Sequence, residues 1–158
     1  PVYHYTELLA DLVAQGVISL HTPLSGTRVT YHDPCYLARY NHITEAPRKL
    51  IEATGAELVE MPRNGTNTFC CGAGGGRIWM MDGPETEERP SEQRIREAMT
   101  LGELDYFLVS CPKDLAMYGD AVKVVGADQI AIEHWAGSAN LLSRQVVTNQ
   151  VLRDAGVL

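Results

Sequence analysis

The chain has 158 residues, of which 45% are hydrophobic and 21% charged, and its net charge is −7. This length suits one domain with a substantial buried core. The acidic balance argues against nucleic acid or an anionic membrane surface as partner, because both reward clustered Lys and Arg. The sequence contains no run of eighteen apolar residues, so we expect no membrane insertion by this segment.

Hydrophobic periodicity and turn signals predict alternating helices and strands in the first half of the chain. The expected order is helix, strand, helix and strand, over Tyr5–Gln15, Arg28–His32, Glu45–Ala53 and Glu57–Met61. The first strand ends at Asp33-Pro34, which is a turn signal. A glycine-rich, polar segment over Pro62–Pro90 follows and is expected to be mostly loop.

The second half of the chain continues the alternation. We expect a helix over Ser91–Leu101, a strand over Tyr106–Ser110, a short helical start over Asp114–Tyr118, strands over Val122–Val125 and Ile130–Glu133, and a helix over Ala139–Leu158. Strands separated by helices predict an α/β fold, with a mostly parallel sheet flanked by helices in a Rossmann-like three-layer arrangement.

All four cysteines of the chain fall into one pattern. Cys70 and Cys71 are adjacent and run into a glycine-rich stretch, while Cys35 and Cys111 each follow a predicted strand. Ligands of an open parallel sheet bind just outside the carboxyl ends of its strands, so these thiols are expected to meet there. The glycines, including Gly72 and Gly74, would let the backbone approach a bulky inorganic group and aim N–H groups at anionic sulfur.

Other interpretations of the same residues are less favoured. Two disulfides are typical of small secreted domains that lack a core, which this chain does not resemble. A phosphate-binding loop would need Gly-Lys-Ser/Thr after the glycines, whereas Arg77-Ile78-Trp79 follows them. The pattern therefore indicates a metal or cluster site.

Three segments carry a resemblance to a known family. They are His32-Asp33-Pro34-Cys35-Tyr36-Leu37-Ala38-Arg39-Tyr40-Asn41, Cys70-Cys71-Gly72-Ala73-Gly74-Gly75-Gly76-Arg77-Ile78-Trp79-Met80 and Ser110-Cys111-Pro112. In order and spacing they resemble the cysteine-rich CCG domain of heterodisulfide reductase catalytic subunits and of related iron–sulfur oxidoreductases, including glycolate oxidase iron–sulfur subunits. The resemblance covers most of the chain and implies that residues 1–158 are one such domain, the C-terminal copy of a longer iron–sulfur protein.

The resemblance implies an iron–sulfur cluster held by Cys35, Cys70, Cys71 and Cys111. In heterodisulfide reductase that cluster is a noncubane [4Fe–4S] cluster, which draws on one cysteine more than this chain has. The family motif usually ends in a further cysteine where this chain has Asp114. Asp114 would then either bind iron through oxygen or begin the next helix as a favourable N-terminal acid. Four thiolates also suit a cubane [4Fe–4S] cluster or a structural zinc ion.

Several residues next to these cysteines are candidates for tuning the site. His32 could donate a hydrogen bond to a cluster sulfur, or simply fix the turn at the strand end. The cations Arg77 and Lys113 could offset the charge of a thiolate-bound cluster, or form surface ion pairs. We expect Trp79 to pack within the protein.

The favoured function is electron transfer by an iron–sulfur domain within a multi-subunit oxidoreductase. Its partners would be redox subunits, either a flavoprotein or a ferredoxin-like protein, which in this family are often part of the same polypeptide. The alternatives are a zinc-stabilised structural domain and a part of a disulfide-reducing site. The isolated domain is not expected to be catalytic. The expected location is the cytoplasm, including the inner face of a membrane complex.

Overall fold

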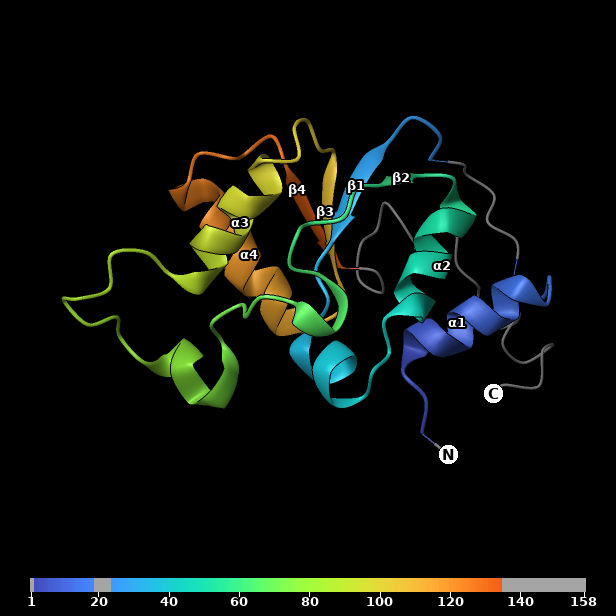
Figure 1. Cartoon of the computed structure of the whole chain (residues 1–158), viewed down its shortest axis with the longest axis horizontal. Coiled ribbons are helices and arrows are strands. Elements are labelled where there is room, and N and C mark those ends of the chain that lie inside the picture. The colour runs from blue at the N-terminus through green and yellow to red at the C-terminus, as the bar shows by residue number, and fades with distance from the viewer. Residues whose placement is uncertain (1, 19–23, 135–158) are drawn as a thin grey trace.

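A computed structural model describes residues 2–18 and 24–134 of the chain (Figure 1). Its centre is a sheet in the order β2-β1-β3-β4, in which neighbouring strands are parallel. The strands are β1 (Arg28–Tyr31), β2 (Glu57–Leu58), β3 (Tyr106–Val109) and β4 (Ala131–His134). The predicted parallel α/β fold is therefore confirmed, although β2 is shorter than the strand expected over Glu57–Met61.

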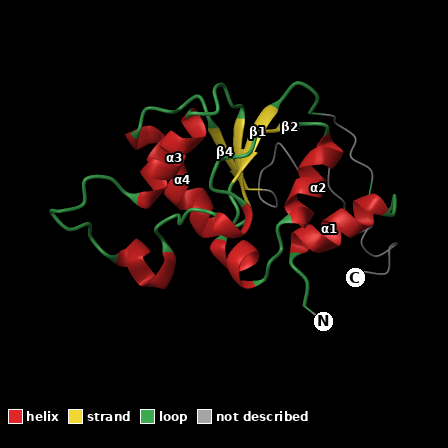
Figure 2. Ribbon diagram, viewed as in Figure 1, coloured by secondary structure: helices red, strands yellow, loops and turns green. Residues whose placement is uncertain are grey.

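Helices cover both faces of the sheet (Figure 2). Helices α1 (Tyr5–Ala14) and α2 (Glu45–Thr54) lie on one side, and α3 (Pro90–Met99) and α4 (Pro112–Val124) lie on the other. Side chains alternate along β3, so that Leu108 joins the core under α1 and α2, while Phe107 and Val109 join the core under α3 and α4. This is the expected three-layer arrangement.

The strand predicted over Val122–Val125 is wrong, because α4 continues through this segment to Val124. Tyr118, Ala121 and Val122 recur at helical spacing and are buried in the core shared with α3. Packing of this helical face outweighs the preference of consecutive valines for strands. The helix expected over Ala139–Leu158 lies outside the described residues. Within the described part of the chain, no helix has the length and hydrophobicity that a membrane span requires.

An ion-pair group lies where α3 meets the loop after β2. Arg63 donates to the Glu97 carboxylate from Nε at 2.9 Å, and its backbone N–H donates to the other carboxylate oxygen at 3.0 Å. Arg94 Nη1 lies 3.0 Å from the same carboxylate. Burial opposes ionisation of Glu97, but the hydrogen bonds from Arg63 and the charge of Arg94 outweigh it, so the pKa of Glu97 is lowered.

This lowered pKa predicts an acid-sensitive contribution to stability. The contribution is present above the ordinary pKa of a glutamate and is lost as the pH falls through the lower pKa of the folded state. We expect Glu97→Gln to lower the free energy of unfolding at neutral pH by about 3 kcal/mol, because it leaves two guanidinium groups short of a counter-charge. Urea unfolding should show this difference shrinking towards about pH 3.

The matched control is Glu88→Gln, since Glu88 pairs with Arg96 at 2.5 Å on the exposed side of α3. That change should cost less than about 1 kcal/mol at neutral pH. A loss for Glu97→Gln that stays the same from neutral to acid pH would contradict the linkage.

Candidate metal centre

Cys35 and Cys111 follow two neighbouring strands at the same edge of the sheet. Cys35 comes after β1 and directly precedes the π-helix η1 (Tyr36–Tyr40), and Cys111 comes after β3 and directly precedes α4. Because β1 and β3 are parallel neighbours, their carboxyl ends lie about 4.8 Å apart. Cys111 lines a surface pocket together with Pro34 and Tyr36, the two chain neighbours of Cys35. Both cysteines are half-buried.

The adjacent pair Cys70 and Cys71 enters the same region from the loop between β2 and α3. Cys70 is exposed and Cys71 is half-buried. Burial raises the pKa of the Cys35 thiol, and the nearby Cys70 raises it further. The pKa of Cys71 is raised by burial and then by the charge of Asp114. Three thiols and one carboxyl group therefore lie within electrostatic reach of one another, and all four cysteines are free thiols.

The backbone after the cysteine pair requires a glycine at position 72. Gly72 has a φ of +85°, which other residues rarely adopt, and a Cβ added there would lie 3.4 Å from the Pro90 ring. Its N–H donates a hydrogen bond to the sulfur of Cys70 at 3.3 Å. This contact is of the kind expected for the glycine-rich loop. Gly74 differs, because it has no such φ and opens the exposed 3-10 helix η3 (Gly74–Trp79).

The buried Asp33 carboxylate joins the segments that carry Cys35 and Cys70. Arg48 on α2 donates to it twice, at 2.8 and 2.9 Å, and the Gly65 N–H donates to it at 2.7 Å. The Thr68 hydroxyl donates to the Asp33 carbonyl oxygen at 2.9 Å. Arg48 is held in turn by Glu60, to which its Nε donates at 2.6 Å. The β1 turn, α2 and the loop leading to Cys70 are thus fixed to one carboxylate.

Asp114 lies in the first turn of α4 and is 2% exposed. Burial raises its pKa to about 6, against which a hydrogen bond with Cys71 acts. Among the described residues, its Oδ2 atom has no hydrogen-bond partner. A helix-capping acid normally accepts from exposed backbone N–H groups, so this buried, partly unpaired carboxyl group does not resemble a simple cap.

His32 and Tyr118 lie behind this carboxyl group. His32 is fully buried, with Nε2 3.8 Å from the Asp114 carboxylate and 3.1 Å from the Tyr118 hydroxyl. Its pKa is lowered, first by burial and then by the positive charge of Arg94. The structure therefore places a neutral imidazole next to Asp114, inside the protein.

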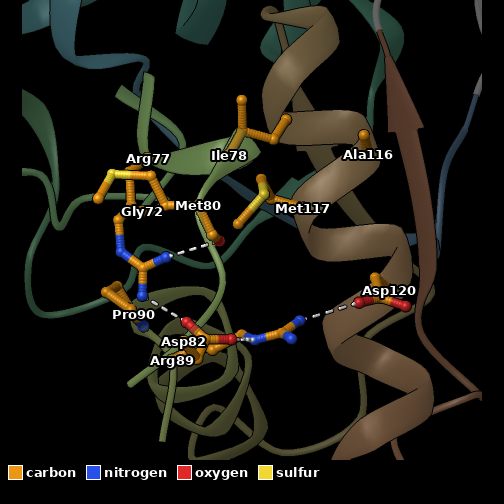
Figure 3. A pocket seen from close by; sticks show the side chains of 10 residues that line it. All are labelled: Gly72, Arg77, Ile78, Met80, Asp82, Arg89, Pro90, Ala116, Met117 and Asp120. Carbon is orange, nitrogen blue, oxygen red and sulfur yellow. Dashed lines mark hydrogen bonds and ion pairs between the residues drawn. The ribbon is translucent and has the colours of Figure 1, made fainter. Parts of the chain in front are cut away.

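The other predicted neighbours face elsewhere. Arg77 is paired with Asp82 in a network that continues through Arg89 to Asp120, around a pocket of about 350 Å³ (Figure 3). This network holds the loop after Cys71 against α4, and Asp82 neutralises the Arg77 charge. Lys113 is exposed.

The expectation that Trp79 packs within the protein is wrong. Its side chain is 87% exposed, and the following residues Met80 and Met81 are also exposed. The short η3 helix stands away from both cores and offers Trp79 no apolar surface.

Four residues of this region were not singled out as site residues from the sequence. Asp33 has the pattern of a turn residue, and Arg48 gives no signal, because its partner is distant in sequence. Arg94 and Tyr118 could have been found. Arg94 shares a helix face with Ala98, four residues on, and Tyr118 lies one turn after Asp114.

Comparison with known proteins gives the chain's relatives. A family described as a cysteine-rich domain, CCG, matches residues 29–116, a range that contains all four cysteines and Asp114. EtfAB:quinone oxidoreductase of Syntrophomonas wolfei subsp. wolfei is 37% identical over 132 residues, which cover 81% of this chain and 18% of that protein. The probable iron-sulfur-binding oxidoreductase FadF of Bacillus subtilis is 41% identical over 128 residues, covering 80% and 18%.

A third relative belongs to the dihydromethanophenazine:CoB–CoM heterodisulfide reductase of Methanosarcina barkeri, as one of its subunits. It is 36% identical over 126 residues, which cover 77% of this chain and 30% of the relative. The chain thus spans less than a third of the length of these relatives. No solved structure matches it.

The Asp33 contacts predict a large effect from a small change. Asp33→Asn removes the negative charge between Arg48 and Gly65, so the free energy of unfolding should fall by about 3 kcal/mol. The matched control is Glu60→Gln, which keeps the Asp33–Arg48 pair and changes its more exposed partner, at a cost of less than about 1 kcal/mol. Urea unfolding measures both, and equal losses would contradict the central place of Asp33.

Proposed function

Because this chain belongs to the cysteine-rich CCG domain family, we propose that it holds an iron–sulfur cluster in an electron-transferring part of an oxidoreductase. The observation that carries the proposal is the delivery of four free thiols by three separate loops to one edge of a parallel sheet. Relatives named as an iron-sulfur-binding oxidoreductase and a heterodisulfide reductase support it.

The donor set fits a cluster better than a single ion. Thiolates are the ligands of iron–sulfur clusters. Among the described residues, no three His, Cys, Asp or Glu side chains converge closely enough to hold one metal ion. A tetrahedral zinc ion needs such convergence, with sulfur atoms about 2.3 Å from the metal. A cluster spreads its ligands over several metal atoms, so the looser grouping favours it over structural zinc.

The proposed ligands are Cys35, Cys70, Cys71 and Cys111. When bound, an iron–sulfur cluster accepts and releases single electrons, which is the chemistry that this site would gain. The half-buried thiols would keep water from one side of the group, and the exposed Cys70 would leave another side open to a redox partner. The Gly72 N–H already points at the Cys70 sulfur, where it would stabilise negative charge.

We further propose that the chain works as one domain of a longer iron–sulfur protein, as its C-terminal copy of the domain. Its partners would be a flavoprotein or a ferredoxin-like protein, in the cytoplasm or at the inner face of a membrane complex. The support is that the relatives are several times longer than this chain and that one is named a quinone oxidoreductase.

The direct test is the metal content of the 158-residue chain, purified without oxygen and reconstituted with iron and sulfide. We expect iron and sulfide in similar amounts, with visible absorption near about 400 nm, as iron–sulfur clusters give. Cys71→Ser should lose most of the iron while the chain stays folded by circular dichroism, because a hydroxyl is a poor iron–sulfur ligand. Lys113→Ala, on an exposed neighbour of the site, should load normally. Zinc bound without iron under these conditions would overturn the proposal.

Asp114 is proposed as an additional, oxygen-donating ligand of the cluster. Its support is the buried Oδ2 atom without a partner among the described residues, next to Cys71. Carboxylate oxygen is an accepted donor to iron in mixed ligand sets.

Asp114→Asn keeps the shape of the side chain and removes its charge, so it should lower the iron content by at least about a half and change the electron paramagnetic resonance spectrum. The control on the same helix is Asp120→Asn, an exposed carboxylate that pairs with Arg89. Unchanged iron content and spectrum in Asp114→Asn would show that Asp114 only begins the helix.

A further inference from the structure

Arg94 on α3 is an unusual core residue. Its side chain is fully buried, the largest side chain in the described part of the protein to be so. Its nitrogens Nε, Nη1 and Nη2 have no hydrogen-bond partner among the described residues, although Nη1 lies 3.0 Å from a Glu97 oxygen. A buried guanidinium with so few partners is costly, because it has lost its hydration without full compensation.

The one nearby counter-charge is divided between two arginines. Glu97 accepts two side-chain hydrogen bonds and one backbone hydrogen bond from Arg63. The Arg63 guanidinium also stacks over the ring of Phe69, directly before Cys70, with 3.7 Å between them. One carboxylate thus faces two guanidinium groups, so this group keeps an excess positive charge beside the cysteine loop.

The charge of Arg94 reaches the side chains that border the thiols. It lowers the pKa of His32, after burial, and its effect on the pKa of Tyr118 favours the ionised form. Tyr118 also senses Asp114 and Cys71, which act on its pKa in the opposite direction. Arg94, Asp114 and Cys71 therefore act on one buried tyrosine, and the medium between them is protein core, which screens charges weakly.

We propose that Arg94 is the counter-charge of the metal centre and raises its reduction potential. The inference rests on the proposed function. Reduction of a thiolate-bound cluster adds one electron and hence one negative charge, with no bond formed or broken. A fixed positive charge in the core stabilises that added charge, as polar neighbours of iron–sulfur clusters do. Arg94 acts through the field and is not a ligand.

The test is a redox titration of the reconstituted 158-residue chain, followed by electron paramagnetic resonance, with dithionite as electron donor. Arg94→Met fills the same space without charge, and should make reduction about tenfold less favourable, which is about 59 mV lower for a one-electron couple. Arg94→Lys keeps the charge and should stay close to the unmodified protein.

Glu97→Gln provides a test of opposite sign. It removes the carboxylate that partly neutralises Arg94, so the potential should rise. A purely structural role for this group would alter the unfolding of all three variants but would not split their potentials by the sign of the change. If Arg94→Met does not fold, the shift in Glu97→Gln still decides the matter.

The outcomes separate the two proposals. Equal potentials for the unmodified chain, Arg94→Met and Glu97→Gln, with full iron and sulfide in each, would overturn the role of Arg94 and leave the cluster in place. Absence of iron and sulfide from the unmodified chain would overturn the proposed function itself.

Discussion

The site depends on the contact between the Asp33 carboxylate and the groups that surround it. This carboxylate lies one step beyond β1 and receives hydrogen bonds from α2 and from the loop after β2. The sheet places Cys35 and Cys111 on neighbouring strands, but it does not place the loop of Cys70 and Cys71. Asp33 does so, by tying that loop at Gly65 to the turn before Cys35. A buried ion pair of this kind is a weak source of stability and a strong source of position.

Much of this arrangement could be predicted from the sequence, because it follows from local patterns. Strand periodicity placed Cys35 and Cys111 at strand ends, and the run after Cys71 indicated a close backbone approach. What could not be predicted depends on contacts between distant residues. The valines after Ala121 favour a strand locally, yet they continue α4 because that helix packs on the core. The exposed position of Trp79 likewise follows from a loop whose path no periodicity describes.

Polar groups occupy the core next to the cysteines at the expense of ordinary packing. Asp114, His32, Tyr118 and Arg94 are all buried there, and only part of their hydrogen-bonding capacity is used. An apolar core of equal volume would be at least as stable. Their retention in one place, behind the cysteines, is the mark of a region whose electrostatics matter more than its contribution to folding.

The unequal exposure of the adjacent cysteines decides where oxidative damage begins. Cys70 is open to solvent and Cys71 is half-buried, so dissolved oxidants reach the first sulfur before the second. Neither of the two hydrophobic cores includes Cys70. Oxidation of this thiol to a sulfinic or sulfonic acid would therefore spoil the ligand set and leave the surrounding architecture standing. A preparation handled in air can keep its full helix and strand content and still have lost the chemistry that it was made to study.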